Sequence, residues 1–519
     1  MPLLQQLLDH QQDLSAVEKF SKFHTDHLAG PEKKYSELIP LSLPKIGEQY
    51  AFEVNLDACT GCKACVVGCH SLNGLDENET WRKTGTMYSE MPLFSSPQTV
   101  TTACHHCVEP GCLLGCPTQA YHKDSVTGIV KHLDDQCFGC RYCELKCPYG
   151  VPQYSERLGV VRKCDMCSSR LASGEAPACA QSCPNEAIKI RIVSQDASER
   201  ALDQNFGPIA GAPAASITLP STQYVSKKIV ADSFQAVDAH LDRPEHAHWP
   251  LVLMLCFTQA GLGVWIATNL GASQLQDAAL GWVFAFALMM LGLGIAPFHL
   301  GRPLLAYRAF LGFRTSWLSR EMLAFGPLPP LALGCMMLAF QPEILQLTGI
   351  DLPFRSTTWY LAWGVGLITL LAVICSAMIY IDTPRTWWSH PRTMAKFFLT
   401  AVCFGALFQN IQAQVHGHDS QIAMMLSLIA CSAKLLLEVS IFWSREAELS
   451  RTARLMRSSL LFPNILRYVL GLLALGFIFF NHPYYSIAAL LLWLAGDIAE
   501  RYLFFRAVVP PRMPGENLS

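Results

Sequence analysis

Sixteen cysteines between positions 59 and 183 fall into four groups of four, with spacings that suit metal–sulfur chemistry. Groups one and three match the C-x-x-C-x-x-C-x-x-x-C run in which three close thiolates hold one iron–sulfur cluster and the fourth ligates another. Groups two and four widen one internal gap. At four thiolates per cluster, the sequence predicts four [4Fe-4S] clusters and a path for electrons. The four groups are Cys59, Cys62, Cys65 and Cys69; Cys104, Cys107, Cys112 and Cys116; Cys137, Cys140, Cys143 and Cys147; and Cys164, Cys167, Cys179 and Cys183.

Two other uses of these cysteines explain the pattern less well. Structural zinc takes two C-x-x-C pairs per ion, which does not explain a C-x-x-C-x-x-C triplet followed by Cys-Pro. Disulfides suit small secreted domains, and we find no secretory signal peptide pattern in this sequence. A zinc-binding membrane scaffold without redox activity is kept as the alternative. Five further cysteines lie singly in apolar runs and are expected to be buried small hydrophobic residues: Cys256, Cys335, Cys375, Cys403 and Cys431.

Composition divides the 519-residue chain, whose net charge is −2, into a polar first half and an apolar second half. Residues 1–49 carry apolar side chains at helical spacing, which predicts an N-terminal helical extension that docks on a partner or on the chain's own ferredoxin-like domain; a loosely ordered tail is the alternative. For 50–193 we expect an α+β duplicated ferredoxin-like domain, with one two-cluster unit inserted into another. Its strands are predicted in QYAFEVNLDAC, TGIVKHLDDQC and CPNEAIKIRIV. Residues 194–245 have the composition of a linker. The absence of a basic stripe argues against nucleic acid as a partner.

From position 246 to 508 the sequence predicts an all-α membrane bundle, followed by a C-terminal tail at 509–519. Each apolar stretch is about 20 residues long, as a hydrocarbon layer of roughly 30 Å requires. Eight transmembrane helices are predicted, at 249–269, 278–298, 322–340, 359–381, 397–414, 421–443, 466–480 and 486–505.

The arginines predict how this bundle is oriented. One set of connections carries many basic residues, such as Arg308, Arg392 and Arg454, whereas Arg355 is the only basic residue on the alternate set. Because positive charge favours the cytoplasmic side, we expect a multi-pass protein of the inner (cytoplasmic) membrane. Both termini and the ferredoxin-like domain would then lie in the cytoplasm.

Polar residues at the predicted membrane edge are candidates for a quinone site. His299 ends the second span in the run PFHLGRP, Arg302 follows it, and Glu321 opens the third span. A quinone headgroup needs hydrogen-bond partners and acid–base groups, which histidine and glutamate supply. Simple solvation by lipid headgroups is the alternative. Lys434 and Glu438 lie four apart and can pair, either as a structural ion pair or as part of a proton path. With no histidine mid-span, we expect no haem.

The four cysteine groups, in this order, resemble the four-cluster iron–sulfur subunit of the DMSO reductase family of molybdenum enzymes. The eight spans with FHLGRP and a downstream SRE resemble the haem-free membrane anchor of the same family, here fused into one chain. The first resemblance covers about 50–193 and the second about 246–508. The resemblance implies that Cys59, Cys62 and Cys65 share a cluster with Cys183, and that Cys164, Cys167 and Cys179 share one with Cys69. It also groups Cys104, Cys107 and Cys112 with Cys147, and Cys137, Cys140 and Cys143 with Cys116.

The resemblance further implies an electron-transfer and membrane-anchor subunit of an oxidoreductase complex in anaerobic respiration. Electrons would pass between menaquinone or ubiquinone, near His299, Arg302 and Glu321, and a separate molybdopterin catalytic subunit. The anchor of a polysulfide-reductase-like or hydrogenase-linked complex is the alternative.

Overall fold

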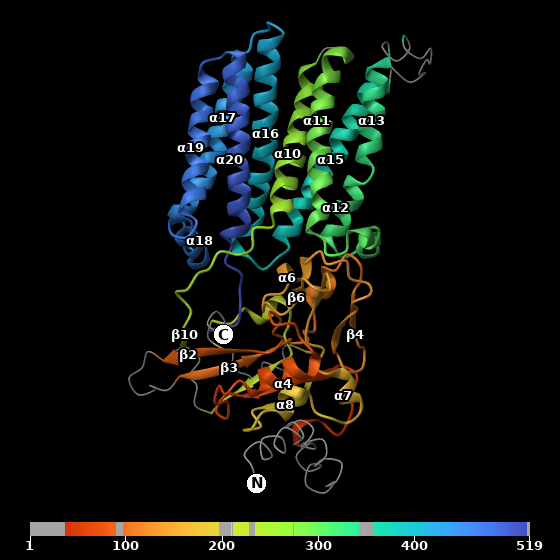
Figure 1. Cartoon of the computed structure of the whole chain (residues 1–519), viewed down its shortest axis with the longest axis vertical. Helices are drawn as coiled ribbons and strands as arrows, with labels where there is room; N and C mark the ends of the chain where they lie inside the picture. Colours follow the sequence, from red (N-terminus) through yellow and green to blue (C-terminus); the bar gives the residue numbers. More distant parts are fainter. Residues whose placement is uncertain are drawn as a thin grey trace, which may run out of the picture.

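The computed structural model describes residues 37–89, 97–196, 209, 211–227, 234–272, 274–341, 346 and 357–515. It has two parts, a cysteine-rich domain and a long helical bundle that stands on it (Figure 1). Most of the N-terminal helical extension predicted for 1–49 lies outside the described residues.

The cysteine-rich domain is built on small sheets. In the largest, β1 (Glu48–Asn55) pairs antiparallel with β8 (Ile188–Ser194), with Tyr50 opposite Ile192. The first and last of the predicted strands are therefore partners. The hairpins β4–β5 (Tyr121–Lys123, Val130–His132) and β6–β7 (Gln153–Ser155, Val160–Arg162) lie between them in the chain. One strand-and-cysteine unit is therefore nested inside another. Five short helices follow the cysteine loops: α4 (Ala64–Asn73), α5 (Gly111–Leu114), α6 (Tyr142–Lys146), α7 (Ser168–Ala172) and α8 (Ala178–Gln181).

The segment predicted as a linker, 194–245, does more than connect the two parts. Its strand β9 (Gln223–Val225) pairs with β1, and β10 (Phe234–Ala236) pairs with β2 (Lys83–Ser89), which also pairs with β3 (Gln98–Thr102). A short 3₁₀ helix, Ala215–Ile217, precedes them. Each added strand covers a sheet edge that would otherwise expose unpaired backbone groups. The Ala- and Pro-rich composition concealed these strands because each is only three residues long.

Seven helical segments among the described residues have the length and composition to cross a membrane. They correspond to the first seven predicted spans, with small differences. The third is broken between α12 and α13 at Gly326 and Pro327, and the seventh begins at Leu461, five residues before the predicted start. The helices are α10 (Trp249–Gly271), α11 (Leu275–Ile295), α12 (Trp317–Phe325), α13 (Leu328–Ala339), α15 (Thr358–Ile381), α16 (His390–Val415), α17 (Gln421–Val439) and α19 (Leu461–Phe479).

Helix α20 (Pro483–Arg506) falls at the position of the eighth predicted span but is not among those seven. It carries Asp497, Glu500 and Arg501, all buried. It packs against α19 and also contacts α10 and α16. Figure 1 shows it running alongside them over the height of the bundle. Charge, rather than length, distinguishes it from the other long helices.

Candidate functional site

The cysteine loops converge into four quartets of neighbouring thiols. In the distal quartet, Cys59 lies near Cys62 and Cys183, and Cys65 also lies near Cys183. The second quartet brings Cys69 to Cys167 and Cys179, and Cys164 to all three. Each set of neighbours joins three cysteines of one sequence group to one cysteine of another, in the arrangement that the resemblance implied. The distal quartet is Cys59, Cys62, Cys65 and Cys183, and the second quartet is Cys164, Cys167, Cys179 and Cys69.

The inner two quartets follow the same rule. In the third quartet, Cys107 and Cys112 both lie near Cys104 and Cys147. In the membrane-side quartet, Cys140 lies near Cys116 and Cys137, and Cys143 lies near Cys137 and Cys140. The third quartet is Cys104, Cys107, Cys112 and Cys147, and the membrane-side quartet is Cys137, Cys140, Cys143 and Cys116. Cys104 and Cys164 also lie close enough to interact, which connects the third quartet to the second.

Two of the quartets line cavities. All four cysteines of the third quartet line one cavity, and all four of the distal quartet line another. Within the described residues, no three His, Cys, Asp or Glu side chains are grouped as a single metal ion requires. The donor set, four thiols around a cavity, fits an iron–sulfur cluster.

Burial and buried cations set the electrostatics of the quartets. Burial raises the pKa of the Cys69 and Cys107 thiols to about 12, and that of Cys147 to about 11, so that binding of a metal must displace the protons. Lys163, fully buried, lies near Cys104, Cys112 and Cys164 and donates to the backbone carbonyl of Cys164 at 2.8 Å. Such a cation offsets part of the thiolate charge. No motif in the sequence singles it out.

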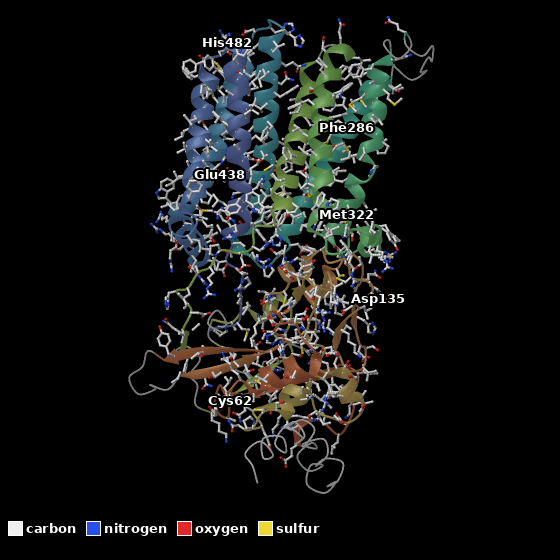
Figure 2. The ribbon with its side chains drawn as sticks, viewed as in Figure 1. Cys62, Asp135, Phe286, Met322, Glu438 and His482 are labelled. Carbon is white, nitrogen blue, oxygen red and sulfur yellow. The ribbon has the colours of Figure 1, made fainter. Side chains whose placement is uncertain are left out.

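The membrane-side quartet is held against the bundle by glycines. The Gly301 backbone N–H reaches the Gly139 carbonyl at 3.4 Å, and a Cβ on Gly301 would lie 2.1 Å from the Gly159 carbonyl oxygen. Gly312 donates to Pro117 O at 2.8 Å, directly after Cys116. Only glycine permits backbones to approach this closely. The opposite end of the domain carries the exposed Cys62, as Figure 2 shows.

His299 lies at the end of the second span, beside this contact. Its Nδ1 is hydrogen-bonded to the carbonyl of Ala296. Because a carbonyl can only accept, Nδ1 carries the proton, and the neutral ring keeps Nε2 as an acceptor. The charge of Arg141, in the loop between Cys140 and Cys143, acts on His299. His299 is therefore positioned next to the cysteine-rich domain with one nitrogen available to take a proton.

Glu321 is buried in α12, with 5% of its surface exposed. The hydroxyl of Ser376 on α15 donates to its carboxylate. Tyr142 packs in the core of the bundle, and its hydroxyl, which has no hydrogen-bond partner among the described residues, lies within electrostatic range of Glu321 and Cys140. No direct contact between Glu321 and His299 is found in the described part of the chain. The consecutive residues Arg141 and Tyr142 lie within electrostatic range of His299 and Glu321, respectively.

Tyr142 was missed in the sequence because a tyrosine between two cysteines carries no signal of its own. Arg302, by contrast, was predicted as part of the quinone site. It donates to two backbone carbonyls of the cysteine-rich domain, Leu158 O at 3.2 Å and Asp134 O at 2.9 Å. Arg302 therefore helps to hold the cysteine-rich domain against the helical bundle.

An open crevice leads from the surface to this junction. It has a volume of about 590 Å³ and is lined by Arg141, Glu144, His246 and His248, among others. The His246 and His248 rings lie 4.8 Å apart. Burial lowers the pKa of His248 to about 3, and the guanidinium charges of Arg141 and Arg385 act in the same direction, so its imidazole is neutral at pH 7.

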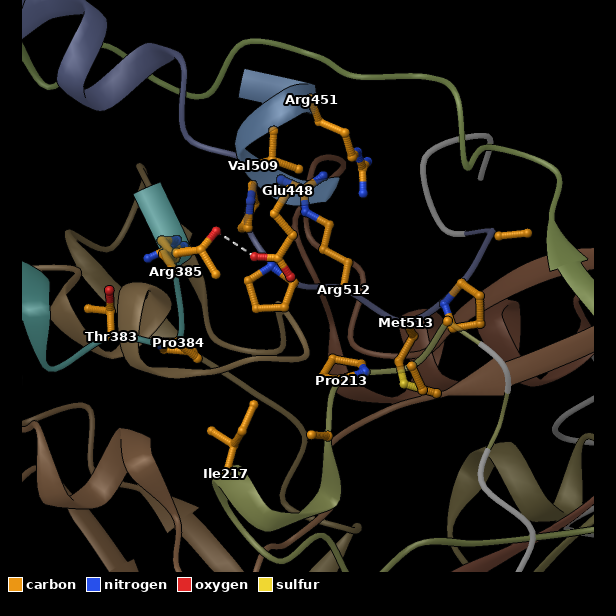
Figure 3. Close-up of a pocket in the computed structure, with 18 of the residues that line it drawn as sticks. Pro213, Ile217, Thr383, Pro384, Arg385, Glu448, Arg451, Val509, Arg512 and Met513 are labelled. Carbon is orange, nitrogen blue, oxygen red and sulfur yellow. Dashed lines mark hydrogen bonds between the residues drawn. The ribbon is translucent and has the colours of Figure 1, made fainter. Parts of the chain in front are cut away.

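A larger cleft lies beside it, between the C-terminal tail, α18 (Ala447–Arg457) and the cysteine-rich domain (Figure 3). Its volume is about 1010 Å³. Several of its charged groups are paired across elements, including Lys146 with Asp382 at 2.8 Å and Arg451 with Asp242 at 2.6 Å. We assign these pairs to the docking of the two parts of the molecule.

Lys434 and Glu438 do not pair with each other. Lys434 contacts Asp497 of α20 and donates to Thr400 at 2.6 Å, whereas Glu438 accepts two hydrogen bonds from Arg467, at 2.8 and 2.9 Å. A second set joins Lys396 to Glu500 at 2.9 Å and Arg501 to Glu500 at 3.1 Å. Sequence spacing put Lys434 and Glu438 on one helix face, but partners on neighbouring helices compete for both.

Comparisons with known proteins agree with this arrangement. Residues 97–192 match the model of a 4Fe-4S dicluster domain, and residues 245–506, about half of the chain, match that of the DMSO reductase anchor subunit (DmsC). The B subunit of anaerobic dimethyl sulfoxide reductase from Haemophilus influenzae is 33% identical over 183 residues, covering 34% of this chain and 87% of the relative. The probable anaerobic dimethyl sulfoxide reductase protein YnfG of Escherichia coli (strain K12) is 34% identical over 194 residues, covering 35% and 87%. Hydrogenase-2 operon protein HybA of Escherichia coli O157:H7 is 34% identical over 156 residues, covering 25% and 48%.

The chain therefore belongs to the DMSO reductase family, as an iron–sulfur protein fused to an anchor of the DmsC type. It is a membrane protein that transfers electrons through 4Fe-4S clusters. The resemblance stated from the sequence is confirmed.

Proposed function

We propose that this protein carries electrons between a membrane quinone and a molybdopterin catalytic subunit, through four [4Fe-4S] clusters held by the four quartets. The observation that carries the proposal is the placement of Arg141 and Tyr142. They belong to the loop of the membrane-side quartet, yet they lie within electrostatic range of His299 and Glu321 of the bundle. A headgroup bound among these residues would lie beside the first cluster ligand.

We also propose a role for each part of the chain. Residues 50–193 bind the clusters, 194–245 join the parts, 246–508 form the anchor and 509–519 form the tail. We propose α20 as the eighth span, because Asp497, Glu500 and Arg501 are buried against other helices and do not face lipid. An even number of spans places both termini on the arginine-rich side, which we assign to the cytoplasm. The cysteine-rich domain lies on that side.

The quinone site takes up or releases its protons on the side of the membrane where the cysteine-rich domain lies. Nε2 of His299 accepts a hydrogen bond from a quinol hydroxyl or, once protonated, donates to a quinone oxygen. Glu321 serves the second oxygen, and the Tyr142 hydroxyl orients the headgroup. His248 and His246 lead to the open crevice, where protons are released or taken up. Because no proton crosses the bilayer, turnover is not electrogenic. The clusters supply one-electron chemistry, and the protein tunes their potentials through burial and hydrogen bonds.

The test uses the membrane-bound complex. His299→Ala and Glu321→Gln should each lower quinol-linked cluster reduction by about 10²-fold, the usual contribution of an acid–base group. His482→Ala, at the opposite end of the bundle, is the matched control and should not change the rate (Figure 2). Iron and sulfide analysis should give about sixteen irons per chain. Normal quinol kinetics in both variants would refute the site, and stoichiometric zinc would refute the clusters.

A hydrogenase-linked complex is the second candidate, because the chain also matches HybA over 25% of its length. The anchor match favours the first candidate. Isolation of the complex from membranes decides between them, because the copurified catalytic subunit contains either a molybdopterin or a hydrogenase metal centre.

A further inference from the structure

Arg82 is a buried cation that the electron path described above does not use. It directly precedes β2, has 1% of its surface exposed, and lies over the Phe52 ring at 4.6 Å. Its Nη1 donates to Thr101 Oγ1 at 3.4 Å. Among the described residues, its Nε and Nη2 have no hydrogen-bond partner and no carboxylate lies within ion-pair distance. A buried guanidinium without a counter-charge is costly, so negative charge must come from elsewhere.

The groups that surround Arg82 are thiols of two different quartets. Cys65 belongs to the distal quartet, whereas Cys69, Cys164 and Cys179 belong to the second. Burial by itself lowers the pKa of Arg82, but the four thiolates together outweigh it and raise the pKa above its ordinary value. Cys65 also donates to or accepts from Thr101 at 3.6 Å, the same hydroxyl that Arg82 contacts. Arg82 is therefore within electrostatic range of thiols of both quartets, and it is linked to Cys65 of the distal quartet through the Thr101 hydroxyl.

We propose that Arg82 is shared by the clusters of the distal and second quartets, and that it raises the reduction potentials of both. The inference rests on the proposed function, because it requires clusters in these quartets. Reduction adds one electron, and hence one negative charge, to a cluster. A fixed positive charge in a low-dielectric interior stabilises the reduced form, and N–H donors near cluster sulfur act in the same direction. One residue thus sets two potentials together.

The membrane-side quartet provides an internal reference. The charges that act on its thiols include those of Asp134 on Cys137 and Glu144 on Cys143. It also lies at the other end of the cysteine-rich domain, next to the bundle. A charge change at position 82 should therefore leave the potential of this cluster where it is.

The experiment is an EPR-monitored redox titration of the membrane-bound protein with its clusters. Arg82→Gln should shift two of the four potentials downward and leave the other two unchanged. Arg82→Lys keeps the charge but loses the forked donors, so it should shift the same two potentials by a smaller amount. Arg162→Gln is the matched control, because the Arg162 charge is already paired with Glu79 at 3.0 Å. A Cys140→Ser variant identifies the signal of the membrane-side quartet.

The titrations have distinct outcomes. A shift of all four potentials, of the membrane-side signal alone, or of none in Arg82→Gln overturns the proposal. If Arg82→Gln loses its clusters, the Arg82→Lys titration decides, and unchanged potentials there overturn it. A wild-type protein without four cluster signals would instead refute the proposed function, so the two failures can be distinguished.

Discussion

Buried carboxylates have different surroundings in the two halves of the helical bundle. In the first half, Glu321 is buried with a neutral hydroxyl, Ser376, as its hydrogen-bond partner. In the second half, Glu438, Asp497 and Glu500 each lie against Lys or Arg, and all are buried as well. Among the described residues, no cation lies within ion-pair distance of Glu321.

The difference separates a structural use of charge from a chemical one. A buried ion pair holds neighbouring helices in one arrangement, and removing one partner leaves an uncompensated charge. An unpaired buried carboxyl gains nothing for the fold, which agrees with the acid–base role that we propose for Glu321. The first half also contains His299 and meets the loop that carries Arg141 and Tyr142. The helices of the second half are instead held together by their buried ion pairs.

The largest expected effect comes from making the same substitution in both halves. Glu438→Gln should lower the free energy of unfolding by about 3–5 kcal/mol, because Arg467 loses its bidentate partner. Glu321→Gln should leave stability nearly unchanged, since no buried cation loses its partner. Thermal unfolding in detergent measures both. The double variant Glu438→Gln with Arg467→Gln should recover part of the loss, and equal destabilisation by both single variants would contradict the comparison.

A smaller effect is expected where the first half meets the cysteine-rich domain. Gly301→Ala places a Cβ 2.1 Å from Gly159 O, and overpacking of this kind costs about 1–3 kcal/mol. The junction should loosen, so that quinol-linked reduction falls while iron content is retained. Gly476→Ala in α19 is the matched control, because nothing lies within 4 Å of the added Cβ. Stopped-flow reduction of the clusters by quinol measures the rate. Equal rates in the two variants would show that electron transfer from the quinone site to the clusters does not depend on this contact.

The smallest effect is expected from a single hydroxyl. Ser376→Ala removes the hydrogen bond to Glu321, a contribution of about 1 kcal/mol, and should change quinol-linked turnover by less than tenfold. Ser427→Ala, whose hydroxyl bonds to Ala423 of its own helix at 2.8 Å, should not change turnover. If steady-state kinetics show the same change in both variants, Ser376 has no specific role toward Glu321.

Much of this protein could be read from local sequence. The four cysteine groups are local patterns, since most of the ligands in each loop lie within a few residues. Seven predicted spans were found as helices because an apolar run of membrane length has few other structures available. His299 and Glu321 were predicted from their position at span ends, and both lie at the junction with the cysteine-rich domain.

Only the tertiary structure decided which groups meet. Lys434 contacts Asp497, 63 residues away, and not Glu438 on its own helix. Tyr142 and Arg141 look like spacers between cysteines, but the tertiary structure places them within electrostatic range of Glu321 and His299, respectively. Arg82 acquires its neighbours from the first and fourth cysteine groups, which are far apart in the sequence. Spacing determines which residues share a loop or a helix face, whereas the pairing of charges and the order of the quartets depend on contacts between distant segments.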